Sequence, residues 1–180
     1  MSSAPKTPLH HCLSRATGLV IGGVLLSILI AGNGLAKSST ANVNEQVLIE
    51  GGSFLHPGSS NGLRLFVDSF WLDKTPVTWK QFKNFAEHTR YWSKTLQTHV
   101  SEFPDTAPVV YVTYDEASAY CREFGERLPS EVEWEYAAAG GREKIPYTYT
   151  PEEQAELTWY GGAKKNPKPV AQSPANGYGI

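Results

Sequence analysis

Three segments of the chain carry the same helix-start signal, and this signal constrains the fold more than any other feature. Thr78, Thr113 and Ser130 are each followed three residues later by Gln or Glu. The spacing is typical of a capping box, in which the hydroxyl accepts a bond from the third helical N–H and the longer side chain returns to the capping residue. Glycines at 125 and at 140 and 141 are suited to end the second and third helices. The sequence therefore predicts helices beginning after residues 78, 113 and 130.

Short extended segments precede these helices. Residues 47–49 and Phe54-Leu55 lie on either side of Gly51-Gly52, which predicts two strand pieces around a glycine turn or bulge. Apolar and polar residues alternate over 63–67, and this period of two predicts a half-buried strand that continues into Phe70-Trp71-Leu72.

The remaining segments complete the prediction of fold class. The apolar run 109–112 predicts a buried strand, and Pro151 favours a short helix over 151–157 within a loop-rich region that begins at Arg142. The chain has 180 residues, of which 41 % are apolar, so one globular core is expected. With strands first and helices later, the predicted fold class is α+β.

The first 36 residues have the pattern of a targeting or anchoring segment. Residues 16–36 contain no charge, and their centre, residues 19–31, is strongly apolar. Lys6 and Arg15 precede this run, and the small-residue exit Gly34-Leu35-Ala36 follows it, which is the order found in secretory signals. A bilayer needs about 20 apolar residues, so the uncharged span could also cross a membrane if it were not cleaved.

These observations predict three regions. Residues 1–36 are a signal peptide or an N-terminal membrane anchor, residues 37–45 are a linker, and residues 46–180 are the folded domain. Because a basic flank remains on the cytoplasmic side, the domain is expected to be extracytoplasmic, whether periplasmic, secreted or anchored facing outward. Contact with a membrane is expected only through the N-terminal segment.

Charge and side-chain spacing indicate few candidate sites. The net charge is −2, and all of the acidic residues lie beyond the N-terminal segment, so capture of nucleic acid is not expected. The histidines of the predicted domain are scattered, and no pair has the spacing of metal ligands; they are His56, His88 and His99. The acidic cluster after Ser130 is interpreted as a negative first helical turn and consists of Glu131, Glu133 and Glu135. With Cys12 assigned to the leader, Cys121 is left alone and is interpreted as a buried core thiol.

Several blocks in order strongly resemble the formylglycine-generating enzyme family, also called sulfatase-modifying factors. They are IEGGSF (49–54), FWLDKTPVTWKQFKNF (70–85), YDEASAYCREFGE (114–126), RLPSEVEWEYAAAGG (127–141) and PANGYGI (174–180). The resemblance implies a loop-rich, C-type-lectin-like variant of the α+β class. It also implies the family reaction, in which oxygen and copper convert a sulfatase cysteine to formylglycine. A sulfatase or another exported protein would then be the partner.

The resemblance covers only the N-terminal and central part of the family's domain. The copper-binding cysteine pair of the family lies in a part that follows the NGYGI block, and Cys121 matches a scaffold cysteine instead. Pro76 also stands where the family commonly has Glu. We therefore predict no catalytic, cofactor or metal residue in this chain, with copper and possible calcium left to complete members. Thr158 to Tyr160 lie near a calcium region of the family but lack convergent oxygen ligands.

Three functional interpretations remain open, so whether the chain is an enzyme is undecided from the sequence. The first is a partial or shortened family domain without oxidase activity of its own. The second is a non-catalytic module that binds a peptide or glycan. The third is an oxidase that becomes competent when a missing C-terminal part completes it. A truncated domain would also be expected to expose unpaired strand edges and aromatic side chains.

Overall fold

The computed structural model describes residues 12–15, 44–55, 62–141 and 167–180. The apolar run 19–31, His56, the predicted helix 151–157 and residues 158–160 lie outside these ranges. Among the described residues, no helix is both long enough and apolar enough to span a bilayer. The described elements, in chain order, are β1 (Leu13–Arg15), β2 (Gln46–Ile49), β3 (Gly52–Leu55), β4 (Arg64–Val67), β5 (Phe70–Asp73), α1 (Trp79–Thr89), α2 (Lys94–His99), α3 (Tyr114–Glu123) and α4 (Glu131–Ala139).

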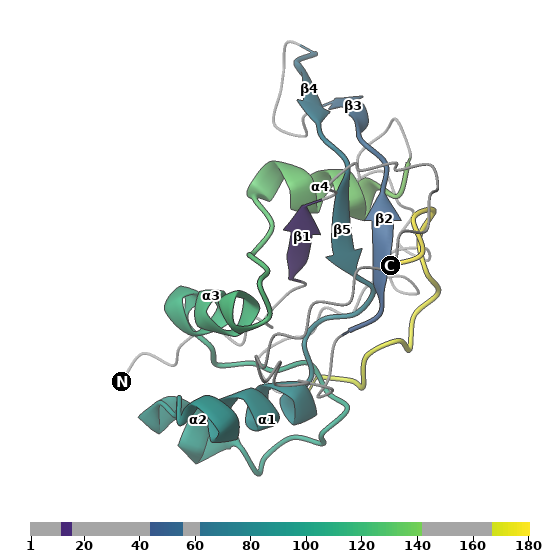
Figure 1. Ribbon diagram of the computed structural model, residues 1–180. Coiled ribbons are helices and arrows are strands. Elements are labelled where there is room, and N and C mark those ends of the chain that lie inside the picture. The colour runs from purple at the N-terminus through teal and green to yellow at the C-terminus, as the bar shows by residue number, and fades with distance from the viewer. Residues whose placement is uncertain (1–11, 16–43, 56–61, 142–166) are drawn as a thin grey trace, which may run out of the picture.

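The main sheet has three strands in the order β1-β5-β2, with β5 antiparallel to both neighbours (Figure 1). Leu72 pairs with Leu13 on one side and Val47 on the other, so these three side chains share a face. The same alternation places Asp73 on the opposite face from Leu72, at the end of β5. Both edges of β5 are therefore paired, and the expected loss of strand partners does not occur at this strand.

A separate hairpin of β3 and β4 continues above the main sheet in Figure 1. Residues 63–72 therefore do not form the single strand predicted from their alternation, because the chain leaves one sheet and enters the other between Val67 and Phe70. Gly51 lies at this crossing, where an added Cβ would come within 2.5 Å of the carbonyl oxygen of Val67. The glycine is needed for this close approach of two backbones.

All three predicted capping boxes are present. The hydroxyls of Thr78, Thr113 and Ser130 accept from the N–H groups of the third helical residue, and the Gln or Glu side chain returns to the cap in each case. Helix α4 ends at Gly140, which has a left-handed backbone with φ of 61°. The sequence did not predict α2, which begins after Ser93 and buries one side chain, Leu96.

The predicted strand over 109–112 was wrong. Val109 and Val110 are buried as expected, but Tyr111 has a φ of 65°, which an extended strand cannot contain. The region forms an isolated bridge between Thr78 and Pro108 and a bond from the Val109 N–H to the Val77 carbonyl (2.9 Å), but it belongs to no described strand. Apolar composition predicted the burial correctly but not the backbone conformation.

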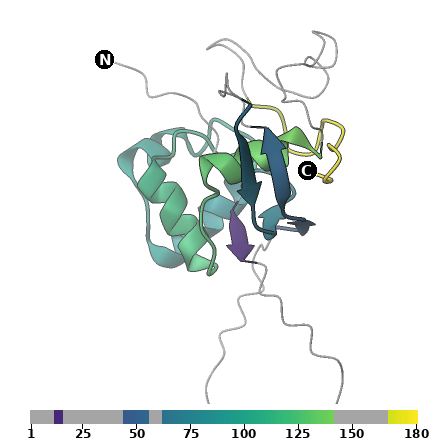
Figure 2. The same ribbon diagram turned by 90° about the horizontal axis from the view of Figure 1, so that it is seen from above.

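The buried side chains form two clusters. The first lies among α1, α2 and α3, and includes Phe82, which stacks on Tyr120 at 5.6 Å between ring centroids. The second lies between the strands and α4, as the views in Figures 1 and 2 show. Cys12 belongs to the first cluster, whereas the next residue, Leu13, belongs to the second. The short N-terminal segment therefore joins the two cores.

Removing the N-cap of α4 tests how much this capping box contributes to stability. We expect Ser130→Ala to lower the free energy of unfolding by about 1 kcal/mol, because the N–H of Glu133 loses its hydroxyl acceptor. Urea unfolding followed by tryptophan fluorescence measures the change. Ser130→Thr keeps the hydroxyl and should retain most of the stability, and an equal loss in both variants would contradict a capping role.

Candidate functional site

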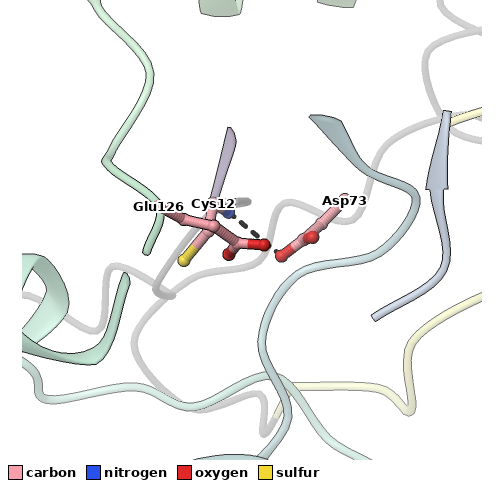
Figure 3. Close-up of side chains that lie close together, drawn as sticks. All are labelled: Cys12, Asp73 and Glu126. Carbon is pink, nitrogen blue, oxygen red and sulfur yellow. Dashed lines mark hydrogen bonds between the residues drawn. The ribbon is translucent and has the colours of Figure 1, made fainter. Parts of the chain in front are cut away.

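The candidate site lies where the two cores meet. Cys12 precedes β1, Asp73 ends β5, and Glu126 follows the left-handed Gly125 after α3 (Figure 3). The sulfur of Cys12 and one carboxylate oxygen from each acid lie within 4.8 Å of one another. Cys12 and Asp73 are buried, and Glu126 is half-buried. Three segments far apart in sequence thus bring a sulfur and two carboxyl groups together.

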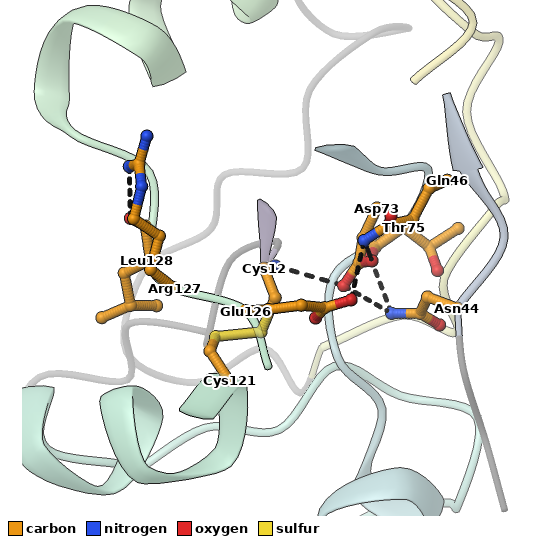
Figure 4. The surroundings of a disulfide bond; sticks show 9 residues. All are labelled: Cys12, Asn44, Gln46, Asp73, Thr75, Cys121, Glu126, Arg127 and Leu128. Atoms are coloured by element: carbon orange, nitrogen blue, oxygen red, sulfur yellow. Dashed lines mark hydrogen bonds between the residues drawn. A yellow bond between two sulfur atoms is a disulfide. The ribbon is translucent and has the colours of Figure 1, made fainter. Parts of the chain in front are cut away.

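A disulfide joins Cys12 to Cys121 across 109 residues, with 5.6 Å between the Cα atoms (Figure 4). The prediction of Cys121 as an isolated core thiol was therefore wrong, although its burial was correct. The isolation followed from assigning Cys12 to the leader, since charge and hydropathy patterns give no sign of a three-residue strand. The structure places Cys12 to Arg15 in the folded sheet, within the segment 1–36 predicted as leader.

Backbone hydrogen bonds of Leu13 hold this N-terminal segment on the side of β1 that faces away from β5. Its N–H donates to the carbonyl of Arg127 at 2.8 Å, and the N–H of Arg127 donates back to Leu13 at 3.0 Å. Together with β5, this bridge gives β1 partners on both sides. The disulfide is therefore one of several connections that hold residues 12–15 in the domain.

Asp73 is the hydrogen-bonding centre of the site. Its carboxylate accepts from the backbone N–H of Cys12 (3.1 Å), from Asn44 Nδ2 (3.1 Å) and from Gln46 Nε2 (3.0 Å). Burial raises the pKa of Asp73, and these three donors oppose that rise by stabilising the charged form. The carboxylate therefore ties β1, β2 and β5 together.

Glu126 faces the same donor. Gln46 Nε2 also donates to Glu126 Oε1 at 2.9 Å, so one amide group bridges the two acids. Burial, followed by the charge of Asp73, raises the pKa of Glu126 to about 7. Burial and the same two carboxylates raise the pKa of the neighbouring Tyr120 as well, so this phenol stays protonated. The protonated form of Glu126 therefore predominates only below about pH 7.

This pKa predicts a pH dependence of stability in the disulfide-bonded chain. Because the folded pKa of Glu126 is about 7 and its ordinary value is 4.5, the folded state binds a proton that the unfolded state has lost, and stability falls as pH rises between these values. Glu126→Gln should remove this slope and raise the free energy of unfolding at pH 8 by about 1 kcal/mol, after allowance for solvent screening. Urea unfolding of the variant and the wild type at pH 5 and pH 8 measures this change in the free energy of unfolding.

Glu133 provides the matched control. Its contact with Arg127, 2.5 Å from the guanidinium to Oε1, lowers the pKa of Glu133 to about 2, so its stabilisation is present above 4.5 and is lost as pH falls towards 2. Glu133→Gln should therefore change the acid side of the profile and leave the slope between pH 5 and 8. A Glu126→Gln variant with the wild-type slope would contradict the assignment.

Within the described part of the chain, the histidines and acidic residues singled out from the sequence form no second metal-binding cluster. His88 lies exposed on α1, and His99 stacks on Tyr111 with 4.0 Å between ring centroids. Glu133 serves the cap of α4, as predicted, and pairs with Arg127. Sequence reasoning missed Asp73, Glu126, Asn44 and Gln46, for which the available signal was a charge directly after the apolar Phe70-Trp71-Leu72 and another after Gly125.

Comparison with known proteins identifies the family to which the chain belongs. A family model described as "Sulfatase-modifying factor enzyme 1-like domain" matches residues 33–180. A serine/threonine-protein kinase pkn1 of Chlamydia caviae is 34 % identical over 161 residues, covering 76 % of this chain and 25 % of the relative. A hercynine oxygenase of Mycolicibacterium smegmatis is 30 % identical, covering 72 % and 40 %.

A formylglycine-generating enzyme of Mycobacterium tuberculosis is 41 % identical over 96 residues, covering 44 % of this chain and 32 % of the relative. The chain thus spans between a quarter and two fifths of the length of these three relatives. Their names describe different activities, so similarity alone does not select one of them. The matched residues include the sheet strands β2 to β5 and all four described helices, and the chain belongs to the sulfatase-modifying-factor family, that of the formylglycine-generating enzymes.

Proposed function

We propose that this chain is an exported domain of the formylglycine-generating enzyme type that does not oxidise cysteine on its own. The observation that carries the proposal is the Cys12–Cys121 disulfide. The chain has two cysteines, and both are used in this bond. A C-type-lectin-like arrangement is proposed with it, supported by the short strands and by the family to which the chain belongs.

The donor set does not fit the copper of the family reaction. Copper(I) prefers soft thiolate ligands, and a disulfide offers no thiolate. The groups beside the disulfide are the carboxylates of Asp73 and Glu126, which are hard oxygen donors. Copper-dependent oxidation of a sulfatase cysteine would therefore need ligands that the disulfide-bonded chain does not provide, and no step through copper is assigned to it.

An activity assay tests this proposal. The purified, disulfide-bonded full chain is incubated with copper, oxygen and a peptide containing Cys-x-Pro-x-Arg, and the aldehyde is sought by mass spectrometry after hydrazide capture. We expect no aldehyde above the level without protein, while the Mycobacterium tuberculosis relative run in parallel serves as the positive control. Aldehyde formed by the chain alone would overturn the proposal. Aldehyde formed only after a second polypeptide is added would favour the completed oxidase.

A second candidate function is the binding of a peptide or glycan, and one cavity favours it. The cavity has a volume of about 640 Å³, within the range of ligand pockets, and Lys74 and Lys168 lie among prolines in its wall. Lys74 pairs with Glu45 at 2.6 Å, whereas Lys168 is exposed. A partner with carboxylate groups, such as a segment of a sulfatase or another exported protein, suits this wall.

Binding to a panel of acidic and neutral peptides, measured by fluorescence anisotropy, tests the second candidate. Lys168→Glu should weaken the binding of acidic peptides, and Lys80→Glu, an exposed change on α1, should leave it unaltered. Equal binding by both variants and the wild type would contradict a role for the cavity.

A further inference from the structure

Three side chains with metal-binding atoms converge between the two cores, and a fourth, Cys121, is bonded to one of them. Cys12 and Cys121 contribute two sulfurs, and Asp73 and Glu126 contribute carboxylates on the side of Cys12 (Figure 4). They come from four places in the chain, namely the start of β1, helix α3, the end of β5 and the turn after α3. In the disulfide-bonded state, the sulfurs are occupied by each other. When that bond is broken, both sulfurs become available as thiolate ligands.

We propose that reduction of the Cys12–Cys121 disulfide creates a zinc site with two thiolate and two carboxylate ligands. A dithiol reductant supplies the two electrons and two protons, so that the S–S bond breaks, two thiols form and the reductant becomes a disulfide. Zinc binding then releases the two thiol protons, because the thiolate is the ligand. The number of ligands, four, is the number that structural zinc sites use.

The positions of three of the four proposed ligand atoms suit such a site after a small adjustment. The sulfur of Cys12 and the two carboxylate oxygens lie within 4.8 Å of one another, whereas ligands of one tetrahedral zinc ion are about 3.5 Å apart. The carboxylates must therefore move inward by about 1 Å, which side-chain rotation can supply. The sulfur of Cys121 lies outside this group, so it must approach the carboxylates once its bond to Cys12 is broken.

The ligand types favour zinc over the alternatives. Calcium and magnesium take oxygen ligands and do not select thiolates, while copper(I) selects thiolates and gains little from carboxylates. Zinc accepts both sulfur and oxygen. Two thiolates and two carboxylates around one ion therefore point to zinc.

The surrounding hydrogen bonds hold the carboxylates in place. Asn44 and the backbone N–H of Cys12 donate to Asp73 Oδ2, and Gln46 donates to both acids. Gln46 also lies opposite Asp73 in the sheet register, so the backbone positions this bridge. Such outer contacts orient the ligands of metal sites, and their removal weakens metal affinity by about 10- to 100-fold.

Cobalt(II) is the probe for the experiment, because thiolate coordination gives it sulfur-to-metal charge-transfer absorption. The full chain is reduced with a phosphine under anaerobic conditions and titrated with Co²⁺, and Zn²⁺ is then added in competition. We expect one Co²⁺ per chain only after reduction, with displacement by Zn²⁺. Asp73→Asn and Glu126→Gln should each weaken binding about tenfold or more, and Gln46→Ala about tenfold.

Glu133→Gln and Asp105→Asn are the matched carboxylate controls and should bind as the wild type does. The proposal is overturned if the reduced wild type binds no more tightly than Cys12→Ser, or if the Asp73→Asn and Glu126→Gln variants retain wild-type affinity. Near-UV circular dichroism follows the fold throughout. If reduction unfolds the chain, Zn²⁺ should restore the native spectrum in the wild type and not in Asp73→Asn, and failure of that restoration also overturns the proposal.

Discussion

Replacing Cys121 with alanine is expected to lower the free energy of unfolding by about 4 to 5 kcal/mol. The disulfide closes a loop across 109 residues, and in the chain-entropy description a loop of that length removes this much freedom from the unfolded chain. The loss is a large share of the 5–15 kcal/mol that is typical of a whole domain. It would be the largest effect of any single substitution considered for this chain.

Either cysteine can be replaced to test this, because the loss of either one breaks the same disulfide. Cys12→Ala should cost about as much as Cys121→Ala, and the double variant should cost little more than either, because each single change already breaks the bond. Urea unfolding followed by tryptophan fluorescence and circular dichroism provides the free energies. Ala119→Gly on the same helix is the control for a small change beside Cys121. Fully additive losses from the two cysteine variants would contradict the disulfide.

The helix starts are the part of the fold that local sequence determines. Thr78, Thr113 and Ser130 act within three residues of their partners, so the pattern and the structure describe the same contact. Helix α2 carried no such pattern, because its cap Ser93 lacks an acid or amide at the third position and one apolar residue gives no period. Val109 to Val112 failed for the opposite reason, since composition cannot reveal the left-handed Tyr111.

The candidate site was beyond sequence reasoning for a different reason. Asp73 and Glu126 are 53 positions apart in the printed sequence, and Cys12 lies far ahead of both. Nothing local distinguishes them from surface acids or from a leader cysteine. The clue that was available is physical, since an acid that directly follows a buried apolar strand must be solvated by other groups if it is itself buried. Asn44, Gln46 and the Cys12 N–H are those groups.

The second large effect concerns the predicted leader. Cys12 and Cys121 must be on the same side of a membrane to bond, whereas a single crossing by residues 16–36 would separate them. The disulfide and the anchor are therefore alternatives, and the paired Leu13 favours the disulfide. Cleavage by a signal peptidase after Ala36 needs the same crossing, because the basic flank before residue 16 stays on the cytoplasmic side, so cleavage also excludes the disulfide. We expect non-reducing peptide mapping of the full chain, made in an export-competent host, to find Cys12 and Cys121 in one cross-linked peptide.

Intact mass under two conditions decides between the possibilities. A chain cleaved after Ala36 should lack the mass of residues 1–36 with or without reductant, because Cys12 would then have been on the cytoplasmic side and unable to bond Cys121. An uncleaved chain with the disulfide keeps one mass in both conditions and gives the cross-linked peptide. A free Cys12 that reacts with maleimide from the cytoplasmic side, while the domain is protected outside, would show that residues 16–36 span the membrane. The bond between the two cores would then be absent, since β1 could not reach β5 across the bilayer.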